Sequence, residues 1–312
     1  MVKVTQRVAE TPGSSSRVSG ELRLSGIYVF PVKSAKGIKV TEARASATGF
    51  EFDRRWMVVD QAGRFVTQRT QPRLVHVETA LTPEHLVLSA PGHGEVRVPL
   101  RLEPERSQTV TVWHDTLHAR EESQEATDFF SDLLGAPHRL VRFPQAGERE
   151  VPRVGKDGLA PELDNASGSS ENRVTGRRVQ FADAFPFLLI SQGSLDLLNE
   201  KLAAKGVPPM GMERFRPNLV VSGCEPHAED TWEALLVGDM RFDVVKPCAR
   251  CSIPSVDPEK ATYGVEPLRT LATYRREAGK VLFGQNLVHH DEGVVTRELP
   301  VRAVEAAESS AG

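Results

Sequence analysis

The sequence has few of the features that mark disulfide-rich, membrane-spanning or nucleic-acid-binding proteins. Cysteine occurs three times in 312 residues, too rarely for a disulfide framework, so a reducing compartment is expected. A formal net charge of −3 argues against a nucleic-acid partner. No apolar run approaches the roughly 18–20 residues that cross a bilayer, and the N-terminus lacks the apolar core of a signal peptide. These absences favour a cytoplasmic protein with no membrane partner.

Short alternating segments between turn residues make up most of the sequence. Such a pattern predicts a β-sandwich or barrel, and we expect three hairpins with turns at residues 61–63, 91–94 and 114–116. Apolar residues at helical spacing predict three helices, over residues 125–134, from a cap at Ser194 to about Gly206, and from about Glu266 onward. The expected fold class is therefore mainly β with a few helices (α+β).

Two of the three cysteines fall in one short segment, Lys246-Pro-Cys-Ala-Arg-Cys251. Alternation over residues 240–245 predicts a strand that turns over at Pro247, which would place a thiol at a strand end. The neighbouring cation, Arg250, favours the thiolate, the form of cysteine that binds metals or attacks electrophiles. We expect the chemistry of the protein to lie in this segment.

Four kinds of site are compatible with the cysteines and the basic residues. Cys224, His227, Cys248 and Cys251 have a spacing that suits zinc, although free cysteine is often simply buried. A redox Cys-x-x-Cys pair is disfavoured, because Pro254 follows too closely for the helix that such motifs usually open. A single thiolate can ligate a metal held mainly by a cofactor. An anion site is indicated by predicted turns and strand ends carrying Lys33, Ser34, Arg54 and Arg216.

Ordered motifs in both halves of the chain match one protein family. The first half contains Ile27–Ser34, Gly49, Asp53–Trp56 and Thr67–Leu74; the second contains Phe181–Asp183, Phe185–Pro186, Phe215–Ser222, Lys246–Cys251, Val256–Pro258 and Leu282–Gln285. The sequence thereby resembles molybdenum cofactor sulfurase C-terminal (MOSC) domain proteins, and among them the amidoxime-reducing molybdenum enzymes. A polar, flexible composition predicts a disordered leader (1–20) and a flexible loop (146–178). The resemblance implies an N-terminal β-barrel-like module (21–145) and a β-barrel MOSC domain (179–306), followed by a tail (307–312).

The resemblance also implies a mononuclear molybdenum enzyme with a pterin (molybdopterin) cofactor. Counted from the strand-end proline, the family's metal ligand falls on Cys251 rather than on Cys248. The matching positions for the pterin phosphate are Lys33, Ser34 and Arg54, and further cofactor contacts are expected from Arg216, Asn218 and Arg250. Asp257, close to the ligand in sequence, is expected to act in proton supply, although a turn aspartate before a proline is an equally good interpretation.

The implied activity is the reduction of small N-hydroxylated compounds, such as amidoximes, hydroxylamines and N-hydroxylated bases, by removal of oxygen. Electrons would come from a separate flavoprotein, ferredoxin-like protein or haem protein. Cofactor sulfuration is a second possibility, but the chain has no pyridoxal-phosphate domain; binding of pyridoxal phosphate is at most a family-level association. A cofactor carrier without turnover and a zinc-stabilised structural module are the remaining alternatives.

Overall fold

The structure is a computed structural model of the chain and describes residues 21–145, 147–151 and 177–305. The predicted leader, most of the predicted loop and the predicted tail lie outside these residues. Strands are the commonest regular elements of the described residues and the helices are short, which confirms the expected mainly β fold. None of the helices in the described ranges is both long and apolar enough to cross a membrane.

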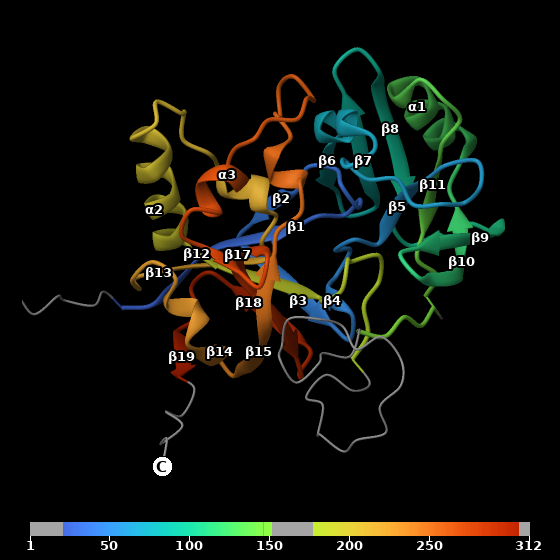
Figure 1. Cartoon of the computed structure of the whole chain (residues 1–312). Coiled ribbons are helices and arrows are strands. Elements are labelled where there is room, and N and C mark those ends of the chain that lie inside the picture. Colours follow the sequence, from blue (N-terminus) through green and yellow to red (C-terminus); the bar gives the residue numbers. More distant parts are fainter. Residues whose placement is uncertain (1–20, 146, 152–176, 306–312) are drawn as a thin grey trace, which may run out of the picture.

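A nine-stranded sheet forms the centre of the second half of the chain (Figure 1). Its order is β19-β14-β15-β17-β12-β13-β1-β2, with β16 paired beside β17. Neighbouring strands are antiparallel except β12 and β13, which are parallel and are joined by a crossover that contains helix α2. The strands are β1 (Arg23–Val29), β2 (Ile38–Val40), β12 (Phe187–Ser191), β13 (Leu219–Ser222), β14 (Trp232–Val237), β15 (Met240–Ala249), β16 (Arg276–Glu277), β17 (Lys280–His289) and β19 (Val301–Glu305).

Three smaller sheets complete the described strands. Two belong to the N-terminal half, and the third joins the start of the chain to its end. Their orders are β5-β11-β10-β9, β6-β7-β8 and β18-β3-β4. The strands are β3 (Glu42–Ser46), β4 (Gly49–Phe50), β5 (Trp56–Val59), β6 (Glu78–Leu81), β7 (His85–Ala90), β8 (Gly94–Pro99), β9 (Ser107–Val112), β10 (Asp115–Glu121), β11 (Arg139–Arg142) and β18 (Gly293–Thr296).

The helices begin and end where local chemistry predicts, with one exception. Helix α1 (Gln124–Leu134) is capped by the Ser123 hydroxyl, and Gly135 ends it in the left-handed conformation. Helix α2 (Gln192–Ala203) is capped by Ser191 and not by Ser194, because the Ser194 hydroxyl is engaged with Glu229 instead. Helix α3 (Leu268–Leu271) is a single turn, and four short 3₁₀ helices accompany it: η1 (Pro72–His76), η2 (Met212–Phe215), η3 (Ala228–Asp230) and η4 (Ile253–Ser255).

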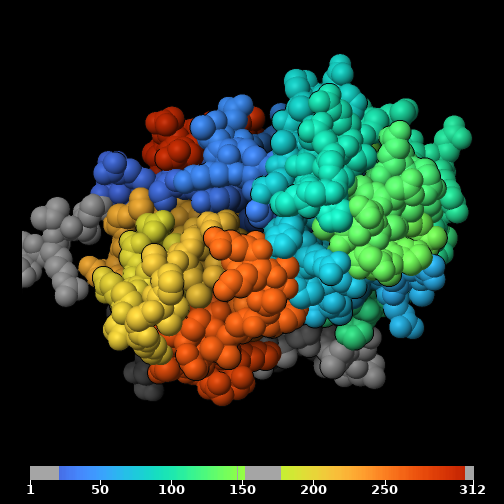
Figure 2. All heavy atoms as spheres, turned by 90° about the horizontal axis from the view of Figure 1, so that it is seen from above, coloured from blue at the N-terminus to red at the C-terminus, as the bar shows by residue number. Residues whose placement is uncertain are grey.

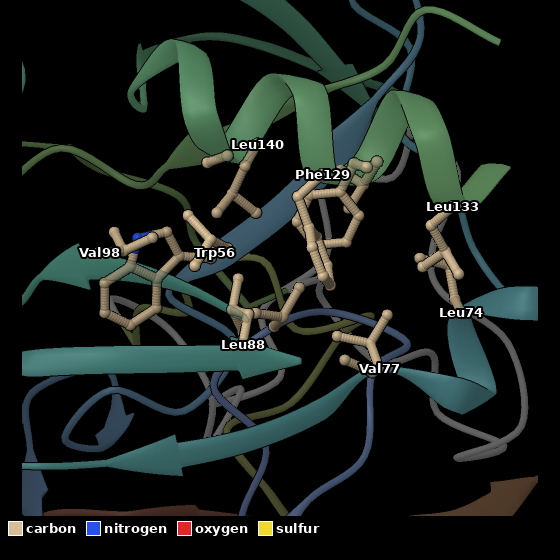
Figure 3. Close-up of a cluster of buried hydrophobic side chains, with 14 of the residues drawn as sticks. Trp56, Leu74, Val77, Leu88, Val98, Phe129, Leu133 and Leu140 are labelled. Carbon is tan, nitrogen blue, oxygen red and sulfur yellow. The ribbon is translucent and has the colours of Figure 1, made fainter. Parts of the chain in front are cut away.

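Each half of the molecule has its own apolar core. In the N-terminal half, α1 packs its buried face on the β6-β7-β8 sheet, and Figure 3 labels eight of the side chains involved: Trp56, Leu74, Val77, Leu88, Val98, Phe129, Leu133 and Leu140. In the second half, the two faces of the long sheet carry separate clusters, one of which includes α2 and α3. Strand β12 is buried along its whole length, as expected for a strand covered on both faces.

The two halves are interlocked rather than strung together. Strands β1 and β2 belong to the N-terminal part of the chain but extend the long sheet, where β1 pairs with β13. Strand β3 likewise pairs with β18. Across the junction, the Tyr263 hydroxyl donates to the carbonyl of Gln68, and His76 contacts the carbonyl of Glu259 at 3.0 Å. Figure 2 shows the resulting continuous surface, with orange residues of the second half against cyan residues of the first.

One local prediction from the sequence was wrong, and another held only in part. The chain does reverse at residues 61–63, since Val66 N donates to Val58 O (2.8 Å) and Phe65 forms an antiparallel bridge to Val59, but residues 64–68 do not form a strand, and β5 pairs regularly with the distant strand β11. Strand β15 does not turn over at Pro247; it continues to Ala249 and accommodates the proline between two register shifts opposite β17. A proline lacks the N–H of a regular ladder position, and an irregular stretch of pairing is where a sheet tolerates it.

Candidate functional site

A cavity of about 280 Å³ lies where the two halves of the molecule meet. Seven of the eight residues predicted for the site line its wall: Lys33, Ser34, Arg54, Arg216, Asn218, Arg250 and Cys251. They come from sequence positions more than two hundred residues apart, and the fold brings them together. Also on the wall are Thr67, Asp183, Phe185, Lys246, Cys248, Ile253 and Asn286.

Two tight turns present Lys33, Ser34 and Arg54. Ser34 (φ 68°) and Arg54 (φ 49°) both have left-handed backbones, a conformation that costs energy outside glycine and often accompanies functional sites. The buried Asp53 carboxylate joins the turns, accepting from Phe30 N (2.8 Å) and from the Arg54 guanidinium (2.5 Å). Backbone bonds from Lys33 N to Trp56 O and from Arg54 N to Phe30 O, each 2.8 Å, fix the pair further.

Arg54 and Arg216 come from opposite halves of the chain but contact the same aromatic ring. Both guanidinium groups stack on the Phe30 ring, at 4.5 and 4.3 Å from its centroid. Arg54 donates to Asn218 Oδ1 (3.0 Å) and to the Arg216 carbonyl (3.2 Å). Burial and the proximity of Arg54 lower the pKa of Arg216 to about 9. Two partly buried cations side by side form a site suited to an anion.

Strand β15 carries the cysteine segment to the cavity. Arg250 donates to Cys248 Sγ (3.2 Å) and to the Phe215 carbonyl (2.7 Å), so its guanidinium contacts the Cys248 sulfur, whereas the sequence suggested that it supports Cys251. Arg250 Nε is buried and has no hydrogen-bond acceptor among the described residues. Cys251 follows the strand as a half-buried thiol on the cavity wall. The backbone after it is held by Arg214, which donates to the carbonyls of Pro254 and Val256, each at 3.0 Å.

Asp257 is the predicted site residue that the fold does not bring to the cavity. Its carboxylate accepts from the backbone N–H groups of Glu259 and Lys260, each at 2.9 Å, and these bonds hold its pKa below the usual range. This is the geometry of a turn aspartate.

Sequence reasoning did not single out Lys246, Asn286 and Asp53 as site residues. Each of the three belongs to one of the family motifs or lies next to one. The motifs therefore marked the segments that form the site. The sequence alone could not say which side chain of a motif faces the cavity.

The structure does not assemble the possible zinc ligands. Cys224 packs against the core cluster of the long sheet, and Cys248 packs with the cluster around α2 and α3. His227 contacts Ser194 at its Nδ1 (3.2 Å) and lies against the Tyr274 and Phe283 rings. No group of three or more His, Cys, Asp or Glu side chains among the described residues is placed to hold a metal ion. A site ligated by these four residues therefore has no geometric support.

His227→Asn is expected to make the stability of the protein less sensitive to acid. Burial, together with the nearby Arg275 cation, lowers the pKa of His227 to about 4 from 6.5. The unfolded chain therefore binds the extra proton between these two values, and stability falls as the pH falls through that window. Asparagine suits the left-handed backbone here (φ 64°) and does not titrate. Thermal unfolding midpoints above and below the window measure this; an equal fall in variant and parent would contradict it.

The charges on the cavity wall are unbalanced. Five cationic side chains line it (Lys33, Arg54, Arg216, Lys246 and Arg250), against one carboxylate among the described residues, that of Asp183. Buried cations are costly unless an anion meets them. The cations, the unpaired Arg250 Nε and a half-buried thiol on the same wall suit a ligand that carries a phosphate at one end and a thiophilic metal at the other.

Comparison with known proteins agrees with these features. Residues 21–137 match the MOSC N-terminal beta barrel domain and residues 176–302 match the MOSC domain. Mitochondrial amidoxime reducing component 2 of Rattus norvegicus is 34% identical over 81% of this chain and 72% of its own length. Mitochondrial amidoxime-reducing component 1 of Homo sapiens is 32% identical over 88% of this chain and 81% of its own.

Molybdenum cofactor sulfurase of Oryza sativa subsp. japonica is 30% identical over 89% of this chain, which corresponds to 34% of that longer protein. The sulfurase is named for the molybdenum cofactor, and the other two relatives are named for the reduction of amidoximes. The MOSC N-terminal beta barrel domain precedes the MOSC domain in this chain, and the cavity lined by cations and a thiol lies where the two halves meet. The chain belongs to the MOSC family that includes the mitochondrial amidoxime-reducing components.

Proposed function

We propose that this protein is a molybdenum-cofactor-dependent reductase of N-hydroxylated compounds such as amidoximes, hydroxylamines and N-hydroxylated bases. The observation that carries the proposal is the placement of Cys251 on the same cavity wall as five cationic side chains. The names of the relatives, amidoxime-reducing components at 32–34% identity, supply the reaction class. A separate redox protein would deliver the electrons.

The residues present suit the molybdenum-pterin cofactor. Lys33, Ser34, Arg54 and Arg216 would hold the phosphate, since guanidinium and ammonium groups with backbone N–H donors are the usual phosphate partners. Asn218 positions Arg54 through its Oδ1, and its Nδ2 is anchored on the Tyr28 carbonyl (3.2 Å). The Cys251 thiolate would be the protein's ligand to the metal. When bound, the cofactor supplies the two-electron oxygen-removal chemistry.

The protein's own contribution is to bind and orient. Arg54 and Arg216 are fixed by the Phe30 ring and by carbonyl acceptors, so little side-chain entropy remains to be lost when an anion binds. Apolar side chains of Phe185, Leu188 and Ile253 on the same wall limit water in the cavity. Exclusion of water strengthens every charge interaction inside it.

Elemental and pterin analysis tests the proposal. The full chain is purified from a host supplied with molybdate, molybdenum is measured, and pterin is quantified by fluorescence after oxidation. Near-stoichiometric molybdenum and pterin, with turnover of a benzamidoxime-type substrate by a chemical or protein reductant, are the expected results. Cofactor without turnover would favour the alternative of a carrier or sulfur-transfer protein, and zinc without pterin would reject the molybdenum assignment.

Lys33→Ala and Arg54→Ala are each expected to remove most of the bound pterin while the chain stays folded. Lys33 is buried and its ammonium faces the cavity wall, and Arg54 joins the two halves of the site. Arg44→Ala, on strand β3 and away from the cavity lining, is the control. Pterin per mole of protein, with the thermal unfolding midpoint, measures the effect. Full pterin occupancy in both cavity variants would mean that the phosphate is bound elsewhere.

A further inference from the structure

Asp183 occupies an unusual position for a carboxylate in a cavity built of cations. It is the one acidic side chain among the described residues on the cavity wall. It forms an ion pair with the Lys33 ammonium through Oδ1, and the same oxygen accepts from Trp113 Nε1 at 3.3 Å. Lys33 is the cation that the proposed function assigns to a phosphate. The carboxylate and the expected phosphate therefore compete for one ammonium group.

We propose that Asp183 is a resident anion, which pairs with Lys33 while the cavity holds no anionic ligand and moves outward to Arg69, beside Trp113, when a phosphate enters. The proposal rests on the proposed function in taking the entering group to be a phosphate ester. The proposal describes how the phosphate reaches its binding site. It gives Asp183, Trp113 and Arg69 a part in phosphate binding.

The two members of the ion pair differ in their freedom to move. The Lys33 side chain is 6% exposed, and its ammonium also donates to the Phe181 carbonyl at 2.8 Å. The Asp183 side chain is 54% exposed and has no hydrogen bond to Oδ2 from any described residue. An exchange of anions at Lys33 therefore moves the carboxylate and leaves the lysine where it is. A buried ammonium without any anion would be costly, which is why the empty site needs a resident one.

Arg69 and Trp113 form the outer position proposed for the carboxylate. Trp113 lies on the turn between β9 and β10, and the Arg69 guanidinium stacks on its ring at 4.3 Å from the centroid. Arg69 in turn is held by the Thr67 hydroxyl, which accepts from its Nε at 3.3 Å. The Lys33 cation, together with Arg69 and the Trp113 hydrogen bond, holds the pKa of the Asp183 carboxyl well below its usual range. The carboxylate thus stays charged in either position.

The exchange also adjusts the charge of the cavity to its ligand. With Asp183 on Lys33, one of the cations on the wall is neutralised from within the protein. When the carboxylate moves to Arg69, that cation is released to the incoming phosphate, and Arg69 receives a partner at the rim. The buried Lys33 ammonium has an anionic partner before and after the exchange, so it is left without one at neither end point.

Titration with inorganic phosphate tests the proposal without molybdenum or pterin. The full chain is produced in a host that cannot make the pterin, and phosphate binding is followed by calorimetry in a chloride buffer. Asp183→Asn keeps an oxygen that can accept from Lys33 and Trp113 but removes the competing charge. It is expected to bind phosphate roughly tenfold tighter than the parent chain, equivalent to about 1.4 kcal/mol. Arg69→Gln removes the cation that receives the displaced carboxylate and is expected to weaken binding.

Glu95→Gln is the control for the loss of one carboxylate. Glu95 forms an ion pair with Arg97, with side-chain exposures of 48% and 68%, and neither residue lines the cavity. Phosphate affinity in this variant is expected to equal that of the parent. The proposal is overturned if Asp183→Asn binds phosphate no more tightly than the parent, if Glu95→Gln gains as much, or if no chain binds phosphate saturably. A gain confined to Asp183→Asn stands even if the protein never carries molybdenum, which would reject the proposed function alone.

Discussion

Cys251→Ser is expected to reduce turnover of an N-hydroxylated substrate by more than roughly 100-fold, because a serine hydroxyl stays protonated and cannot replace a thiolate as a soft metal ligand. Cys251 lies at the end of β15, on the wall that carries the cations. Since those cations remain in the variant, pterin is expected to be retained in part while activity is lost. Turnover with a fixed reductant, normalised to molybdenum content, is the measurement.

Cys248→Ser is the matched control for that experiment. Cys248 lines the same cavity, but its sulfur accepts from Arg250 and packs with the apolar cluster around α2 and α3. A serine oxygen can accept the same hydrogen bond, so we expect Cys248→Ser to keep most of the activity. If Cys251→Ser and the parent chain turned over substrate equally, the ligand assignment would be wrong. If Cys248→Ser alone lost activity, the ligand would be the other cysteine of the segment.

Arg142→Met is expected to lower the free energy of unfolding by about 3–5 kcal/mol, the cost of leaving the partner of a buried ion pair alone. The Arg142 side chain is fully buried, and its Nε donates to Glu122 Oε1 at 2.7 Å. Its remaining N–H groups donate to the carbonyls of Pro99, Leu100 and Leu102. Methionine fills similar space but strands the Glu122 charge, which would keep only the Trp56 indole N–H at 2.7 Å.

Urea denaturation at neutral pH measures the loss, and two further variants give it meaning. Arg97→Met removes an exposed ion pair with Glu95, with side chains 68% and 48% exposed, and is expected to cost less than about 1 kcal/mol. The double variant Arg142→Met, Glu122→Leu is expected to recover part of the loss, since no charge is then left buried. A loss below about 1 kcal/mol in Arg142→Met would contradict the view that this ion pair organises the N-terminal core.

Local features of the fold followed from local sequence. Helix α1 could be predicted because its apolar spacing and its Gly135 end are contained in a dozen residues, and the hairpins β7–β8 and β9–β10 because their turns lie between alternating strands. Pairing at long range could not. Strand β5 makes only a short local hairpin contact with Phe65, and its regular partner is β11, some eighty residues later; all of its side chains are buried.

The candidate site shows the same division. Motifs named Lys33, Ser34, Arg54, Arg216, Asn218, Arg250 and Cys251, and these side chains do share a cavity wall. Which neighbour each one touches was not predictable. The Arg250 guanidinium contacts Cys248 because β15 remains extended past Pro247, so residues two apart share a face of the strand. Asp257 lies off the cavity because its carboxylate closes a local turn.

By itself, the sequence determined the types of residue available: few cysteines, two of them in one short segment, and cations placed at turns. Residue types and spacings set the local preferences for helix, strand and turn. These preferences do not depend on which distant segments the chain packs together. The tertiary structure decided the rest, by inserting β1 and β2 into the sheet of the second half and so placing Lys33 against Asp183 and Arg54 against Arg216. Contacts of this kind depend on which distant strands pair, and pairing is set by the packing of the whole core rather than by any one segment.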